Sequence, residues 1–354
     1  MLDTSLREWL DAQADALDRG LLDGEAVLTR LGASGVLRLG VGSEQGGSGG
    51  DVVDAVEAIA QVAGHSLTVA FVFWGQRAFV EYLLQSDNAG LRERLLPPLL
   101  SGEKAGATGL SNAMKYLSGI EQLGVTAQTR PGGWQLDGRL PWVTNLRKSG
   151  FSVAAAIELP GAQPFVAALP DDLPGLVRSD DLLLLGLQSS NTAAVQLTEA
   201  FLSEEWLLAA DARQYLPKVR PAFLGLQCGM SLGLARRSLA EARGLLQSGR
   251  SVLEGEWQQL SDELERLQRG LYDGLRAGSF GASPVALFKL RIGLAQVAAE
   301  AVQLELQASG GKAYLQAHGA GFARRLRESA FVPIVTPSLV QLRAQLRKHG
   351  ELAA

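Results

Sequence analysis

The spacing of the apolar residues changes twice along this 354-residue chain, and these two changes constrain the fold most. Apolar residues recur every three or four positions in the N-terminal part, alternate with polar residues from about Ala105 to Trp206, and return to the helical spacing after Ala209. A period near 3.6 predicts helices and a period of two predicts strands. The sequence therefore predicts a mostly helical α+β protein. It has an N-terminal helical domain (1–104), a central β domain of barrel or sandwich type (105–207) and a C-terminal four-helix bundle (208–354).

The helical parts carry their own start and stop signals. A long apolar pattern runs from Val52 to Leu84, and Asp51 can cap its first turn. Ser283-Pro284 predicts the start of a helix, and Gly310-Gly311 predicts its end about seven turns later. Trp257 to Leu275 has an apolar stripe on one face and charges on the other, as in a bundle helix. Candidate strands of the central part are Trp134–Leu136, Phe151–Ile157, Pro164–Leu169 and Ala193–Leu197.

Composition excludes several classes of protein. Apolar residues make up 47% and charged residues 20%, with a formal net charge of -4, so there is no basic excess for nucleic acid. The single Cys228 lies in an apolar stretch, which predicts a buried and inert thiol. His65, His318 and His349 are isolated from any cysteine or second histidine, so no metal site is expected. We find no signal peptide and no membrane-length apolar run, and we expect a cytoplasmic protein.

The best clue to function is Pro141-Trp142-Val143-Thr144-Asn145, which closes a short β-rich segment. A Trp and a Thr two apart on one strand face the same way, so a flat apolar surface would stand beside a hydroxyl donor. That pair suits a flavin ring. Trp142 as a core residue and Thr144 as a strand-end cap are the plainer interpretations.

Six segments in order then resemble those of one family. Gly102 to Ser111 (GEKAGATGLS) is similar to the G-E-K-x-G-A-x-x-L-T-E-P segment of the acyl-CoA dehydrogenases, and Trp142 to Asn145 is similar to their W-[IV]-T-N. The other four are Leu39–Gly49, Gly186–Thr192, Val219–Pro221 as the start of the first bundle helix, and Gln307–Tyr314 as the Q-x-x-G-G-x-G-Y loop. We therefore identify the chain as a member of the acyl-CoA dehydrogenase superfamily.

The resemblance implies a bound FAD, with FMN as the alternative. Ser111 would contact the pyrimidine edge of the flavin, Trp142 would flank the isoalloxazine, and Thr144 would hydrogen-bond near N5. Gly310 and Gly311 would let the backbone approach the cofactor pyrophosphate, commonly that of a neighbouring subunit.

Two arginines complete the implied set. Arg250 keeps the charge of the element that reaches a neighbour's flavin, and Arg220 would stand at the mouth of the substrate cavity. The bundle's apolar outer face further predicts a homodimer or homotetramer.

The sequence departs from the family pattern at the position of the catalytic base. Dehydrogenation of an acyl thioester needs a Glu to take the α-proton while hydride leaves the β-carbon. The usual position of this Glu falls on Thr336, and the position used by some members falls on Val219. Neither side chain is a base, so no catalytic residue is assigned.

Three functions stay open. The first is an FAD-dependent oxidoreductase that dehydrogenates an acyl thioester such as an acyl-CoA with an atypical or missing base, and passes electrons to an electron-transfer flavoprotein. The second is a two-component flavin monooxygenase, which needs a separate flavin reductase and no substrate base. The third is a non-catalytic flavin-binding homologue.

Overall fold

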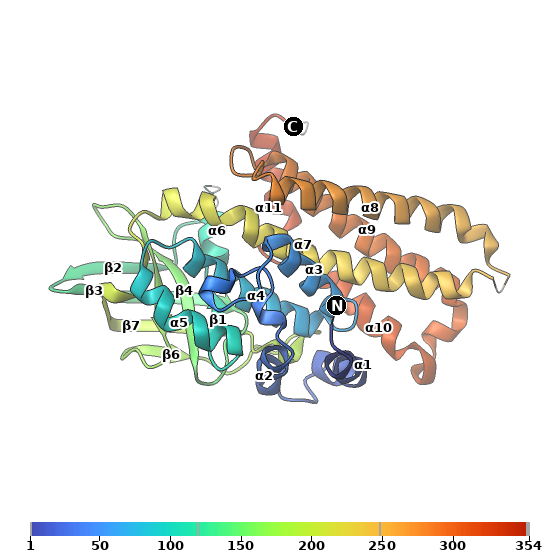
Figure 1. The fold of residues 1–354 in the computed structure, drawn as a ribbon, viewed down its shortest axis with the longest axis horizontal. Helices are drawn as coiled ribbons and strands as arrows, with labels where there is room; N and C mark the ends of the chain where they lie inside the picture. Colours follow the sequence, from blue (N-terminus) through green and yellow to red (C-terminus); the bar gives the residue numbers. More distant parts are fainter. Residues whose placement is uncertain (1, 118, 120, 248, 352–354) are drawn as a thin grey trace.

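The computed structural model describes residues 2–117, 119, 121–247 and 249–351. The N-terminal part is helical and surrounds one buried helix, α4 (Figure 1). Its helices are α1 (Thr4–Asp18), α2 (Glu25–Ala33), α3 (Val52–Ala63), α4 (Leu67–Leu84) and α5 (Ala89–Ser101), with short 3₁₀ turns η1 (Val36–Arg38) and η2 (Ser43–Gln45).

The apolar pattern from Val52 to Leu84 forms two helices rather than one. Asp51 caps α3 through a reciprocal capping box with Asp54, as the sequence predicted for Asp51. Gly64 then ends α3, and Ser66 caps α4 with its side chain. α4 is buried along nearly its whole length, because it packs against the bundle on one side and the β region on the other. An all-round apolar helix is the pattern expected for that position.

The central part contains two four-stranded sheets in the described residues. The first has the order β1-β4-β5-β8 and the second β2-β3-β7-β6, with β1 and β4 parallel and the other pairs antiparallel. The strands are β1 (Ala105–Thr108), β2 (Val125–Arg130), β3 (Gly133–Val143), β4 (Phe151–Ile157), β5 (Phe165–Pro170), β6 (Leu176–Arg178), β7 (Ala193–Ser203) and β8 (Leu207–Ala209). Short helices α6 (Ser111–Leu117), η3 (Gln188–Ser190) and η4 (Glu204–Trp206) lie between them.

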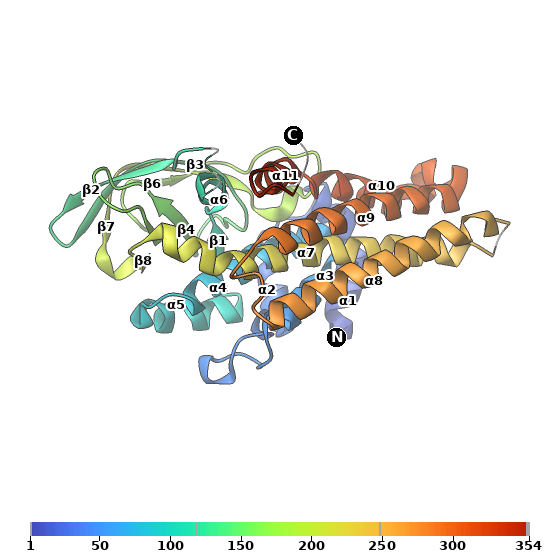
Figure 2. The same cartoon turned by 90° about the horizontal axis from the view of Figure 1, so that it is seen from above.

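The C-terminal part is a bundle of long helices that extends away from the sheets (Figures 1 and 2). Its elements are α7 (Ala212–Leu245), η5 (Ser251–Leu253), α8 (Glu254–Arg276), α9 (Val285–Ser309), η6 (Gly310–Tyr314), α10 (Gln316–Phe331) and α11 (Leu339–Lys348). α9 begins just after Pro284 and ends before Gly310, as predicted. The predicted fold class is thus confirmed, whereas the division into domains at residues 104/105 and 207/208 stays a prediction.

The predicted start of the first bundle helix is wrong by two turns. Asp211 caps α7 by accepting hydrogen bonds from the amides of Arg213 and Gln214, so the helix begins at Ala212. Val219–Pro221 therefore lies inside α7, and Pro217 and Pro221 are tolerated within it. This places Arg220 on a continuous helix that packs along α9.

Candidate functional site

Thr144 lies in a buried cluster of hydroxyl groups just beyond the end of β3. Its Oγ1 donates to the carbonyl of Ser190 at 3.4 Å and accepts from Thr192 Oγ1 at 3.3 Å, and the Ser190 and Thr192 hydroxyls are 2.8 Å apart. α4 approaches closely here, because a Cβ on Gly75 would stand 3.2 Å from Thr144 Cγ2. Both hydrogen bonds of Thr144 are long, so its hydroxyl is bound only weakly by Ser190 and Thr192.

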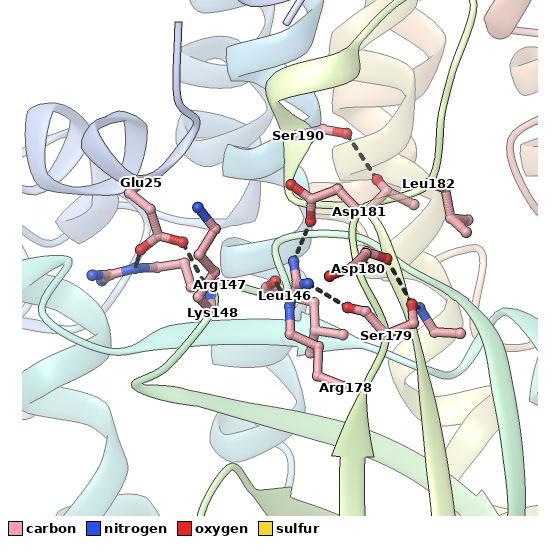
Figure 3. A network of polar contacts seen from close by, with 12 residues as sticks. Glu25, Leu146, Arg147, Lys148, Arg178, Ser179, Asp180, Asp181, Leu182 and Ser190 are labelled. Atoms are coloured by element: carbon pink, nitrogen blue, oxygen red, sulfur yellow. Dashed lines mark hydrogen bonds and ion pairs between the residues drawn. The ribbon is translucent and has the colours of Figure 1, made fainter.

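Two polar networks fix the chain that follows Thr144 (Figure 3). Glu25, at the start of α2, accepts from the side chain of Arg147 and from the amide of Lys148, each at 3.0 Å. On the other side, Arg178 forms an ion pair with Asp181 and donates to the carbonyl of Leu146 at 2.9 Å. The hydroxyl cluster is therefore held from both α2 and the segment that precedes β7.

Asn145 anchors the same turn and is more than the turn residue that the sequence suggested. Its Nδ2 donates to Gln76 Oε1 at 2.8 Å and to the carbonyl of Gly106 at 2.9 Å, and its backbone φ is 56°. Asn tolerates this left-handed conformation better than most residues. Gln76 was missed by the sequence reasoning, although a glutamine inside the mostly apolar α4 was its signal.

Trp142 and Thr144 differ in exposure, which corrects the prediction that they share one strand face. Trp142 is 62% exposed, whereas Thr144 is 4% exposed and lies beyond the last residue of β3, Val143. The register of β3 against β7 shifts between Leu140 and Val143, and this irregularity ends the simple alternation. Ser111, the first residue of α6, is half-buried.

A second group of predicted residues lies together at the opposite end of the molecule. Gly310 ends α9 with φ 61°, and a Cβ at that position would stand 3.2 Å from Arg250 Nη2. Open space surrounds the Cβ position of Gly311. The start of α8 and the end of α9 lie at the tip of the bundle far from the sheets (Figures 1 and 2). This exposed backbone beside a guanidinium is chemically suited to a pyrophosphate.

The remaining predicted residues lie where α7 meets α9 and the loop after α10. Arg220 is half-buried, its guanidinium carbon is 5.8 Å from the centroid of the Phe288 ring, and its Nε has no hydrogen-bond partner. Val219 is fully buried, and Thr336 is half-buried in the loop that precedes α11. The carbonyl of Thr336 accepts from Gln227 Nε2 at 3.0 Å.

Gln227 leads to a buried arginine that the sequence reasoning missed. Arg291 on α9 is 0% exposed and donates to Gln227 Oε1 at 2.8 Å and to the carbonyl of Val332 at 2.7 Å. Burial lowers the pKa of the Arg291 guanidinium and raises the pKa of the neighbouring Cys228 thiol to about 12. Cys228 is buried and free, as expected for an inert thiol.

Comparison with known proteins agrees with this architecture. Residues 1–103 match the family model of the acyl-CoA dehydrogenase N-terminal domain. The N-terminal match, the curated relatives and the fold together support the acyl-CoA dehydrogenase superfamily for this chain. Butyryl-CoA dehydrogenase from Megasphaera elsdenii has a similar fold, with a TM-score of 0.84 and 19% identity over 98% of this chain and 95% of that one.

Two further proteins are similar to this chain. Benzylmalonyl-CoA dehydrogenase from Aromatoleum aromaticum is 25% identical over 239 residues, which is 66% of this chain and 63% of that protein. The structure of KijD3 in complex with FMN and a dTDP-amino-keto sugar has a TM-score of 0.80 at 19% identity, covering 99% of this chain and 92% of that one. None of the described helices is long and apolar enough to cross a membrane.

Proposed function

We propose that this superfamily member is a flavin-dependent oxidoreductase that binds FAD and dehydrogenates an acyl thioester without the usual Glu. The observation that carries the proposal is the Thr144 hydroxyl cluster on a turn that is fixed from two sides (Figure 3), with the exposed Trp142 two residues earlier in the chain. A bound flavin supplies the hydride acceptor, and the chain supplies the residues that bind and surround it, which we call the flavin seat. The wider resemblance to FAD-dependent relatives supports the choice of FAD, and FMN is the alternative.

The ring end of the proposed seat needs an apolar face and adjustable hydroxyl groups. Trp142 presents the exposed aromatic surface on which a flat ring can pack. The long bond from Thr144 to Ser190 can be exchanged for one to the ring near N5 at little cost. Ser111 at the start of α6 offers a further hydroxyl for the pyrimidine edge.

The pyrophosphate end of the seat requires a second copy of the chain. Gly310, Gly311 and Arg250 cluster where α9 ends and α8 begins, whereas Trp142 and Thr144 lie at the end of β3, next to α4. Because these elements lie in different parts of the molecule (Figure 1), we assign the two groups of a single copy to different flavins. We propose that each flavin lies between two subunits, which makes the functional unit a homodimer or a pair of such dimers.

The residues at the usual positions of the base are compatible with two mechanisms. Val219 is an alkyl group and Thr336 a weakly acidic alcohol, so neither can take an α-proton at neutral pH. A two-component monooxygenase would use a separately supplied reduced flavin and oxygen, and it needs no such base. The fold similarity to an FMN complex with a sugar nucleotide supports keeping this alternative. Electron-transfer flavoprotein or a flavin reductase is accordingly the proposed redox partner.

Flavin titration of the flavin-stripped protein tests the seat. Trp142→Ala should weaken binding of FAD by about two- to twelvefold, because aromatic packing contributes about 0.5–1.5 kcal/mol beyond area burial. Phe201→Ala removes a partly exposed aromatic side chain from the neighbouring strand β7 and serves as the matched control. Equal FAD affinity in the wild type and the Trp142 variant would remove the proposed seat.

Mixed dimers test whether two copies share each flavin. In a heterodimer of Trp142→Ala and Arg250→Ala chains, a shared site leaves one intact seat and one doubly altered seat. At a low FAD concentration the heterodimer should then load half as much flavin as the wild type. If each copy built its own seat, both would carry one substitution and high-affinity loading would be lost.

A further inference from the structure

The protein holds buried and half-buried arginines of two kinds. The first kind is paired with a carboxylate, and its members are Arg77 with Glu81, Arg324 with Glu328, and Arg325 with Glu305. The second kind comprises Arg220 and Arg291, which form no ion pair with any carboxylate in the described part of the chain. The two unpaired cations both lie at the contact between α7 and α9, which we call the seam.

Arg220 is the more exposed cation of this pair. It is half-buried over the Phe288 ring, and no polar group in the described residues accepts a hydrogen bond from its Nε. Burial lowers the pKa of its guanidinium, which remains charged at neutral pH. A guanidinium that is partly removed from water and lacks an acceptor favours a planar anion in front of it.

Arg291 adds a second charge on the same seam. Phe288 and Arg291 are three residues apart on α9 and so share one helix face. Arg291 is wholly buried, and its Nη1 has no hydrogen-bond partner although its other nitrogens bind Gln227 and Val332. A buried charge without a countercharge is costly and is normally neutralised by a partner.

Both cations adjoin the positions where the superfamily's carboxylate would be expected. Val219 precedes Arg220 directly, and Thr336 is joined to Arg291 through Gln227. With no carboxylate at either position, the seam between α7 and α9 keeps its full positive charge.

We infer that this seam binds a carboxylate carried by the substrate itself, so that the substrate is an acyl thioester whose acyl group bears a negative charge. The inference rests on the proposed function for the thioester and goes beyond it in naming the anionic acyl group. Arg220 would contact the carboxylate. Arg291 would act through the electrostatic potential of the buried seam and through the loop at Thr336, as a positioning residue.

A matched pair of thioesters tests the inference. Succinyl-CoA and butyryl-CoA have four-carbon acyl groups and differ in the terminal carboxylate. Calorimetric titration of the flavin-loaded protein in chloride-free buffer should give at least tenfold tighter binding of succinyl-CoA. In Arg220→Gln this preference should fall to within twofold. Arg237→Gln, on the same helix but paired with Glu241, should keep the wild-type preference.

The outcomes separate the inference from the proposed function. Equal binding of the two thioesters by the wild type, or a preference that survives in Arg220→Gln, overturns the inference while leaving the flavin enzyme intact. If neither thioester binds, the proposed substrate class fails, and titration with succinate decides the anion site. Saturable binding of succinate that is lost in Arg220→Gln supports the site, and no such binding overturns it.

Discussion

Replacing a buried or half-buried arginine should lower the melting temperature strongly where the arginine has a carboxylate partner and change it little where it has none. Arg325 is 6% exposed and forms an ion pair with Glu305, which is 2% exposed. Arg325→Met leaves the Glu305 carboxylate buried without a countercharge, which costs about 3–5 kcal/mol. For a chain of this size about 2 °C of melting temperature is lost per kcal/mol, so we expect a decrease of about 6–10 °C.

Arg220→Met is the matched substitution at an unpaired site. It removes a partly desolvated charge that no carboxylate of the described chain neutralises, and the Met side chain can still contact the Phe288 ring. The lost cation–π contact contributes about 0.5–2 kcal/mol and is offset by relief of the desolvation cost. We expect the melting temperature to change by no more than about 2 °C. Thermal unfolding of the two variants side by side is the assay, and a loss at Arg220 as large as that at Arg325 would refute the reasoning.

Four further substitutions test other parts of the molecule. Gly311→Ala should weaken FAD binding with no change in melting temperature, whereas Gly310→Ala should weaken FAD binding and also lower the melting temperature. The reason is that, of the two glycines, only Gly310 has a positive φ and a close neighbour. Flavin titration and thermal unfolding distinguish the two variants. Thr336→Glu should speed anaerobic flavin bleaching by an acyl-CoA at least tenfold, since general-base catalysis contributes about 10²–10⁴-fold; unchanged bleaching, with product formed from reduced flavin and oxygen, favours the monooxygenase. Burial raises the pKa of Glu328, whose Oε2 has no hydrogen-bond partner. Protonation of Glu328 therefore stabilises the fold as the pH falls through the folded-state pKa toward the unfolded-state value of about 4.3. Relative to the wild type, Glu328→Gln should therefore lose melting temperature between pH 7 and pH 5, and a pH-independent difference would contradict this.

The period of the apolar residues predicted the fold because each part follows a simple repeat. Strands such as Phe151–Ile157 and the helix between Pro284 and Gly310 lie where the sequence placed them. The start of α7 was misplaced because it was taken from the family resemblance of Val219–Pro221, whereas Pro221 lies inside the helix. Asp211 was the stronger signal, since its carboxylate caps two amides.

The site was harder to predict because its geometry depends on contacts between distant segments. The exposure of Trp142 and the burial of Thr144 follow from a register shift against β7, which leaves no mark in the local pattern. Arg291 lies in an alanine-rich helix that also carries Lys289, Glu300 and Glu305, and charged side chains on such a helix are expected at its solvated edge. Its burial depends on Gln227, 64 positions earlier in the chain.

The absence of a base and the presence of unpaired arginines are connected by charge. A carboxylate at Val219 or Thr336 would lie near the contact between α7 and α9 and would offset part of the positive charge of Arg220 and Arg291. Without it, a ligand with one additional negative charge gains an attraction of about 3 kcal/mol at a separation of about 6 Å and an effective dielectric constant of about 20. Part of that attraction is offset by desolvation of the ligand carboxylate. The remainder is consistent with the tenfold preference expected for succinyl-CoA, and it makes substrate charge the property on which this site would discriminate most strongly.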